Sequence, residues 1–331
     1  MTERAVPSRS EVPIGRPEGL IDPAALMKIK SMELRAKAVV EGFWKGIHRS
    51  PYHGFSVEFT EYRQYAFGDD PRYIDWRVYA RSDRFYIKKF EDETNLRCHL
   101  LLDHSRSMGY ASGKGVPGTP YSKAQYAGTL AATLAYFLFT QGDAVGLATF
   151  DDRIREILPP RNRVSYLRRL ILALEAPPRG RATDLGPPLQ RFAQMLTRRG
   201  MIILISDLLT SIDRLERDLG YLCAGGHDVV VFHILDPAEV SFDFDKPALF
   251  QDVETGRDMF IDPSAAQKGY RHLLDGHLAR TRSVCQSLGI DYHLFATDRP
   301  FDLALLDFLQ HRMRSRKRVR RIHGPGGGRT L

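Results

Sequence analysis

Apolar residues in the central part of the chain occur either in short continuous runs or in longer segments with helical spacing. The runs at 97–103, 200–207 and 228–236 are typical of strands that are buried on both faces. The segment 122–141 is apolar on nearly every side, as expected of an enclosed helix. Strands that alternate with helices in this way predict an α/β fold with a doubly wound, mostly parallel sheet covered on both faces.

Weaker patterns complete the series of predicted elements. The charged segment 152–158 is expected to form a short antiparallel strand at the sheet edge, and 249–262 reads as a hairpin with a turn. The other predicted elements are strands at 143–150 and 290–297 and helices at 164–176, 185–199, 211–226, 270–288 and 301–313.

The first ninety residues have a different composition. Residues 1–20 are expected to be disordered, because few apolar side chains offset the entropy of ordering them. A helix is predicted from Asp22 to about Gly42 or Gly46, and the aromatic and charged stretch 53–90 suggests short strands around turns. The predicted divisions are a disordered terminus at 1–20, a helix with a β-rich subdomain at 21–95, the α/β domain at 96–311 and a tail at 312–331.

The net charge of +8 comes almost entirely from the C-terminal tail. Residues 312–321 hold seven of the 48 lysines and arginines, which leaves 41 basic against 40 acidic residues elsewhere. Such a tail can make salt-sensitive contacts with nucleic acid or with an acidic membrane surface. No aromatic residues for base stacking accompany it, so nucleic-acid binding through the tail is kept only as an alternative function, beside peripheral membrane contact.

The spacing of the cysteines and the length of the apolar runs indicate in which cellular compartment the protein is expected. Cys98, Cys223 and Cys285 are too far apart to predict a disulfide framework or a zinc cluster, and they fit a reducing environment. Residues 1–19 lack the apolar core of a signal peptide, and no apolar run has the length of a membrane span. We therefore expect a cytoplasmic protein without a transmembrane segment.

Oxygen-bearing side chains follow two of the predicted strands. Asp103 ends the first strand and is followed by Ser105 and Ser107, while Asp207 ends the fourth strand. With the strand order 3-2-1-4-5-6, these strands are neighbours where the order reverses, and both carboxylates emerge into one crevice. Two close carboxylates need a counterion, and Thr183 adds a hydroxyl from a nearby loop. Oxygen donors of this kind suit Mg²⁺, with Mn²⁺ as the second choice.

The spacing Asp103-x-Ser105-x-Ser107, with Thr183 and Asp207 later in the chain, resembles the metal-ion-dependent adhesion site of von Willebrand factor A domains. The resemblance implies that these five side chains hold the ion directly or through water. It also implies a partner protein whose Asp or Glu completes the coordination shell. Neutral hydroxyl ligands fit this role, because an ion with few charged ligands remains electrophilic.

An upstream segment narrows the family. "EFTEYRQYAFGDDPRYIDWRVYAR", residues 58–81, resembles the signature that precedes the A-like domain in domain of unknown function family number fifty-eight. That family consists of bacterial companions of MoxR-type AAA+ ATPases, and the resemblance covers about residues 26–310. It implies a von Willebrand factor A-like, Rossmann-type fold and a role as an adaptor with such an ATPase in remodelling an unidentified client protein. Ala182 departs from the expected pattern, where we expect glycine before Thr183.

A magnesium-dependent hydrolase, either a phosphatase or a nuclease, is the main alternative. It would need further carboxylates to position a water molecule. Asp151 and Asp152 follow the second strand, but we expect them in a solvated turn. Ser105 is not in a nucleophile elbow, His104 is expected to point away from the crevice, and no phosphate-binding loop is present. We therefore predict no catalytic residue and no enzymatic activity.

Three further features have secondary readings. Asp184 is expected to cap the following helix, with support of the metal ligands as the alternative. The charged and aromatic residues of 58–81 either fasten the β-rich subdomain to the A-like domain through ion pairs or form a docking surface for the ATPase or its client. The glycine-containing segment 113–123 is expected to be a flexible loop beside the crevice.

Overall fold

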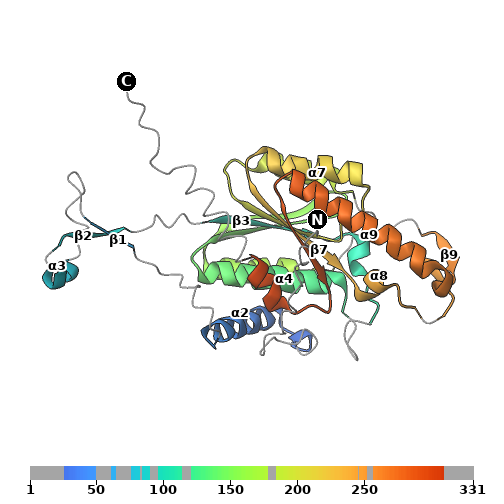
Figure 1. Cartoon of the computed structure of the whole chain (residues 1–331), viewed down its shortest axis with the longest axis horizontal. Helices are drawn as coiled ribbons and strands as arrows, with labels where there is room; N and C mark the ends of the chain where they lie inside the picture. The colour runs from blue at the N-terminus through green and yellow to red at the C-terminus, as the bar shows by residue number, and fades with distance from the viewer. Residues whose placement is uncertain are drawn as a thin grey trace, which may run out of the picture.

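A six-stranded sheet lies at the centre of the protein (Figure 1). The structure is a computed structural model that describes residues 26–49, 61–64, 76–82, 84–89, 96–113, 121–177, 184–244, 246–251 and 256–308. In spatial order the strands are β10 (Asp291–Ala296), β7 (Asp228–Leu235), β6 (Met201–Ser206), β3 (Arg97–Asp103), β4 (Ala144–Phe150) and β5 (Ile154–Arg161). Numbered along the α/β domain, this is the predicted order 3-2-1-4-5-6.

The directions of the strands also agree with the prediction. All neighbouring strands are parallel except β5, which pairs antiparallel with β4 at the edge of the sheet. Strand β3 pairs with β4 on one side and with β6 on the other, so the order reverses between β3 and β6. The carboxyl ends of these two strands are therefore neighbours at the switch point, where ligands bind in sheets of this type.

Side chains of the central strands alternate between two apolar cores. Along β3, Leu100 and Leu102 enter one core and Leu101 enters the other. Along β6, Ile203 belongs to the first core and Ile202 to the second. The continuous apolar runs in the sequence result from this two-sided burial.

Helices cover both faces of the sheet (Figure 1). The first face carries α4 (Lys123–Thr140), α5 (Val164–Leu174), the helical residues 301–308 and, packed against α4, α2 (Met32–Arg49). The second face carries α6 (Gly186–Met195), α7 (Ile212–Ala224) and α9 (Pro263–Ser287). The result is a three-layer α/β/α domain.

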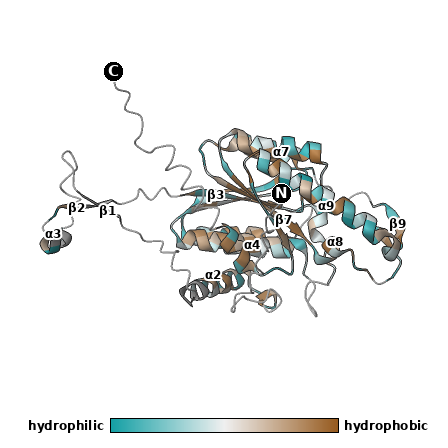
Figure 2. Cartoon of the chain, viewed as in Figure 1, coloured by the Kyte–Doolittle hydropathy of each residue, from teal (hydrophilic) through white to brown (hydrophobic). Residues whose placement is uncertain are grey.

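Helix α4 is enclosed by other elements, which explains its apolar residues. It contacts α2 and α5 as well as strands β3, β4, β6 and β7. Figure 2 shows hydrophobic residues concentrated in the sheet and in α4, with hydrophilic residues on the outer sides of α7 and α9. A capping box fixes the start of α4, because the side chains of Ser122 and Gln125 each accept the other residue's backbone N–H. Lys123 follows as the first residue of the helix and its only charged residue.

The N-terminal helix differs from its prediction. The chain leaves the helical conformation after a first short turn, and α2 begins only at Met32. Ser31 explains the restart, since its hydroxyl accepts a hydrogen bond from the Leu34 N–H at 3.3 Å. The predicted end at Gly42 or Gly46 is wrong, because α2 continues past both glycines.

The stretch predicted as β-rich contains two short strands and one unpredicted helix. Strands β1 (Glu61–Gln64) and β2 (Tyr86–Lys89) pair antiparallel, and α3 (Trp76–Ser82) lies between them in the chain. The rings of Trp76, Tyr79 and Phe85 contact one another. Several residues of the charged cluster lie outside the described residues, so both readings of that cluster stay predictions; they are Glu58, Asp69, Asp70, Arg72 and Asp75.

The C-terminal half contains the predicted hairpin, formed by β8 (Ala248–Gln251) and β9 (Asp258–Ile261). A short helix that the pattern did not indicate, α8 (Pro237–Ser241), follows β7. None of the helices in the described parts of the chain combines the length and apolarity needed to cross a membrane. The segments 1–20 and 312–331 lie outside the described residues.

Candidate metal site

The ends of β3 and β6 bring Asp103 and Asp207 to one edge of the sheet. Asp103 is the last residue of β3, and Asp207 directly follows Ser206, the last residue of β6. The Asp103 carboxylate accepts hydrogen bonds from the Ser105 N–H at 2.8 Å and from the Ser206 hydroxyl at 2.5 Å. Both aspartates have 0% of their surface exposed. The two strands are thus linked by a side-chain hydrogen bond next to the candidate ligands.

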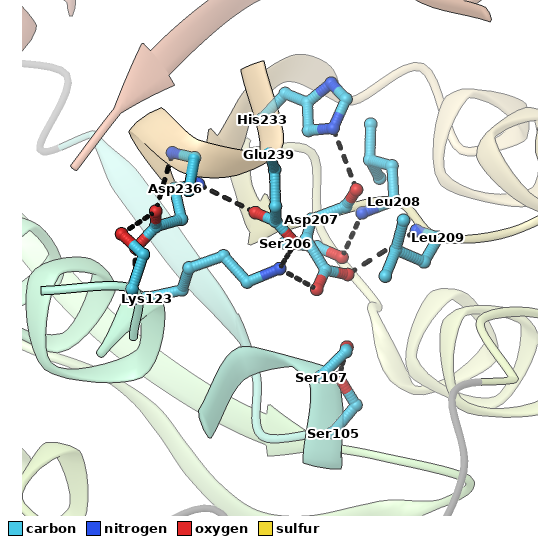
Figure 3. A network of polar contacts seen from close by, with 12 residues as sticks. Ser105, Ser107, Lys123, Ser206, Asp207, Leu208, Leu209, His233, Asp236 and Glu239 are labelled. Carbon is cyan, nitrogen blue, oxygen red and sulfur yellow. Dashed lines mark hydrogen bonds and ion pairs between the residues drawn. The ribbon is translucent and has the colours of Figure 1, made fainter. Parts of the chain in front are cut away.

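A 3-10 turn, η2 (Arg106–Gly109), positions the two serine hydroxyls. Ser105 is the N-cap residue of this turn and Ser107 lies within it. The two hydroxyl oxygens are 3.0 Å apart, and both residues are buried. Figure 3 shows these side chains rising from the turn toward the Asp207 carboxylate. The alternate spacing of the serines therefore places the two hydroxyls side by side at this buried edge of the sheet.

The backbone around Asp207 is held in a defined conformation. One ring nitrogen of His233 donates to the Asp207 carbonyl at 2.8 Å, and the other lies 2.7 Å from the Tyr292 hydroxyl. Burial lowers the pKa of His233 to about 4, so the ring is neutral. Leu208 has a φ of 49°, a left-handed conformation that costs a non-glycine residue roughly 1–2 kcal/mol. Strain of this kind persists where the surroundings determine the backbone, as they do at many functional sites.

A buried lysine from the start of α4 also reaches Asp207 (Figure 3). The Nζ of Lys123 lies 2.9 Å from Oδ2 of Asp207 and 2.7 Å from Oε1 of Glu239, and the lysine side chain is fully buried. The other oxygen of Glu239 accepts the Asp236 N–H at 2.7 Å in the capping box of α8. Burial alone would lower the pKa of Lys123, but the two carboxylates outweigh it and raise the pKa above its ordinary value. The ammonium group is therefore charged.

Asp103 lacks a comparable cationic partner in the part of the chain that the structure describes. Its hydrogen bonds come from neutral donors. Burial is the main cause, and the negative charge of Asp207 the second cause, of the rise in the pKa of Asp103 to about 7. A buried carboxylate in this setting is stabilised by a nearby cation.

The chemistry of the donors identifies the kind of ion that fits. Two carboxylates and two hydroxyls meet at this edge, and hard oxygen donors of this type suit Mg²⁺. Within the described residues no group of three or more His, Cys, Asp or Glu side chains is arranged to hold a metal ion, so an ion at this edge would also need hydroxyl or water ligands. The assignment of these side chains as metal ligands stays a prediction.

The loop that carries the fifth predicted ligand precedes α6. Thr183 and Ala182 lie outside the described residues. The next residue, Asp184, accepts the Gly186 N–H at 3.3 Å at the first residue of α6. The N-cap residue of α6 is Leu185, which has no side-chain cap hydrogen bond, so the capping role predicted for Asp184 is wrong; its side chain closes the turn that leads into the helix.

The groups considered for a hydrolase have other partners. Asp151 and Asp152 both form ion pairs with Arg155. The solvated turn predicted for them is wrong for Asp151, which is 1% exposed, and holds for Asp152, which is exposed. His104 is buried, and burial lowers its pKa to about 4. The Ser105 hydroxyl contacts Ser107 rather than a histidine among the described residues.

Three residues of the site escaped the sequence analysis, namely Lys123, Ser206 and Glu239. Lys123 could have been identified from the sequence, because it is the single charged residue in an enclosed helix and a buried lysine requires a buried carboxylate as its partner. The sequence evidence for Glu239 is weaker and consists of the capping-box spacing that begins at Asp236. The ion pairs of Lys123 with Asp207 and Glu239 join residues that are 84 and 116 positions apart, and no local sequence pattern predicts contacts between such distant residues.

Related sequences extend over nearly the whole chain. Uncharacterized proteins of Mycobacterium tuberculosis and Mycobacterium bovis are 26% identical over 319 residues, which is 95% of this chain and 98% of each relative. An uncharacterized protein of Mycobacterium avium is 29% identical over 150 residues, covering 45% of this chain and 87% of the relative.

Solved structures and a family model complete the comparison. The conserved hypothetical protein BatB from Bacteroides thetaiotaomicron matches with 15% identity and a TM-score of 0.44, over 66% of this chain and 99% of that one. The VWA domain of SpRpn10 matches with 18% identity and a TM-score of 0.32, over 42% of this chain and 75% of that one. The model described as "Protein of unknown function DUF58" matches residues 61–280, more than half of the chain. The chain therefore belongs to the DUF58 family, and its α/β domain has the doubly wound, mostly parallel sheet expected from the sequence.

Proposed function

We propose that this chain is a metal-dependent protein-interaction module. The observation that carries the proposal is the convergence of two carboxylates and two hydroxyls at the carboxyl ends of β3 and β6. These ends form the switch point of the sheet, where ligands bind in doubly wound folds. The carboxylates considered for a hydrolase pair with Arg155, so we do not propose catalysis.

Asp103, Ser105, Ser107 and Asp207 would hold Mg²⁺ directly or through water, with Mn²⁺ as the alternative ion and Thr183 as a fifth ligand. When bound, the ion supplies an electrophilic centre that an incoming carboxylate can complete. Ser206 orients Asp103 through its hydrogen bond, and the left-handed Leu208 fixes the direction in which the chain leaves Asp207.

Access is the critical property of such a site. The four described donors expose between 0% and 2% of their surface. A client carboxylate therefore reaches the ion only if neighbouring side chains move. Capture of a client in magnesium tests this access directly.

The resemblance of residues 58–81 to the family signature supports the proposal that a MoxR-type AAA+ ATPase is the partner of this chain. We propose that the chain acts in the cytoplasm with a MoxR-type AAA+ ATPase. The ATPase supplies energy for remodelling, and this chain recognises the client through an acidic side chain.

Affinity capture tests the proposal. The full-length chain serves as bait in cell lysate with magnesium or with chelator, beside Asp103→Ala and the matched control Asp152→Ala, which removes an exposed carboxylate that follows the neighbouring strand β4. We expect a set of proteins that is retained by the wild type and the control in magnesium and is lost with chelator or with Asp103→Ala. Retention of the same proteins in chelator would overturn the metal-dependent role. Absence of binding between the purified chain and the MoxR-type ATPase of the same cell would overturn the proposed partnership.

A further inference from the structure

Lys123 places a positive charge inside the candidate metal site. Its ammonium group lies 2.9 Å from Oδ2 of Asp207, within the same buried edge as Asp103 and the two serines. Oδ1 of Asp207 is 3.4 Å from the Leu209 N–H, a long contact. The oxygen of Asp207 that is most strongly engaged is therefore the one bound to lysine.

This ammonium group is shared between two carboxylates. Glu239 lies 2.7 Å from the same Nζ, closer than Asp207, and its side chain is partly exposed at 21%. The pair is anchored in α8, because Glu239 also accepts the Asp236 N–H. Glu239 thus draws the lysine charge toward α8 and away from Asp207.

A divalent ion and an ammonium group cannot both hold the same carboxylate oxygen at full strength. A fixed positive charge in a buried site also repels an incoming cation, and screening by solvent is weak there. Lysine in this position therefore opposes the ion, whereas a neutral residue would leave Asp207 free for it.

We propose that Lys123 is an internal competitor that limits the affinity of the site for divalent cations, and that Glu239 moderates this competition by sharing the ammonium group. This inference rests on the proposed metal-dependent function. Weak affinity for the ion alone has a consequence for recognition, because the carboxylate of a client then supplies the missing stabilisation. Ion and client bind together more strongly than either binds alone.

Calorimetric titration of the full-length chain with MgCl₂ tests the inference in three variants. Lys123→Met removes the competitor and is expected to bind Mg²⁺ at least ten-fold more tightly than the wild type. Glu239→Gln leaves the ammonium group to Asp207 alone and is expected to bind several-fold more weakly. Lys37→Met is the matched control, since Lys37 is half-exposed on α2 and pairs with Glu41, and its affinity should equal that of the wild type.

The outcomes separate the two proposals. If the wild type binds Mg²⁺ and Lys123→Met binds it equally or more weakly, lysine orients Asp207 rather than competing, and the inference is overturned while the metal site stands. If none of the variants binds Mg²⁺, the proposed function fails and the inference fails with it. Should Lys123→Met not fold, Glu239→Gln decides alone, and unchanged or tighter binding by that variant overturns the inference.

Discussion

The hydroxyl of Ser206 donates a hydrogen bond of 2.5 Å to the carboxylate of Asp103, and so joins the ends of β6 and β3. The same hydroxyl accepts the Leu208 N–H at 3.0 Å. One serine therefore orients a candidate ligand on one strand and holds the left-handed turn that follows Asp207 on the next.

Replacement of Ser206 by alanine is expected to lower the free energy of unfolding by about 1–3 kcal/mol, because Asp103 loses a donor and the Leu208 N–H loses its acceptor. Magnesium affinity should also fall, since Asp103 is no longer held in place. Urea unfolding and calorimetry measure the two effects. Ser287→Ala is the control, because its hydroxyl donates to a carbonyl within α9, and wild-type magnesium affinity in Ser206→Ala would contradict the orienting role.

The unpaired charge of Asp103 leads to a second prediction. In chelator, Asp103→Asn should be about 1–2 kcal/mol more stable than the wild type, because removal of a buried negative charge beside Asp207 outweighs the loss of one of the two acceptor oxygens. Added magnesium should raise the melting temperature of the wild type and leave that of Asp103→Asn unchanged. Thermal unfolding in both buffers provides the measurement. If Asp103→Asn is less stable than the wild type in chelator, the protein already stabilises the negative charge of Asp103 without a metal ion, and the prediction is wrong.

His99 predicts a dependence of stability on pH. Burial, followed by the positive charges of His227 and Arg97, lowers its pKa from 6.5 to about 4. Between these values the unfolded chain binds more protons than the folded one, so stability is lost as the pH falls from about 6.5 toward 4. His99→Leu should lose about 1–3 kcal/mol less than the wild type over this range, as measured by urea unfolding at several pH values. Equal acid sensitivity in this variant would contradict the prediction, and removal of the exposed His272 provides the control.

Gly200 tests the close approach of the chain before β6 to β3, and Gly220 in α7 serves as the comparison. A Cβ at Gly200 would lie 2.5 Å from the Arg97 carbonyl oxygen, which is backbone and has no room to yield. Gly200→Ala should therefore destabilise the protein by about 1–3 kcal/mol. At Gly220 in α7 a Cβ meets no atom within 4 Å, so Gly220→Ala should stabilise it by about 0.5–1 kcal/mol. Denaturant unfolding compares the two, and a neutral Gly200→Ala would contradict the close approach of the strands.

The sheet could be predicted because its signals are local. Apolar runs that end in Asp103 and Asp207 identify two strands, and helices between the strands impose parallel connections. The strand order was assumed from the doubly wound class of fold, and the structure has that order. The restart of α2 at Ser31 was missed, because an apolar stripe runs across the break. The lysine between Asp207 and Glu239 was missed for a different reason, since it depends on packing between distant segments of the chain.

The hydrogen bond between Ser206 and Asp103 spans 103 positions of the chain. During synthesis, Asp103 and the two serines emerge long before β6, which brings Asp207 beside them. A nascent chain that stops short of β6 has the first half of the motif without Ser206 and Asp207. Under the proposed function, metal-dependent binding would therefore require the chain to be synthesised at least through β6.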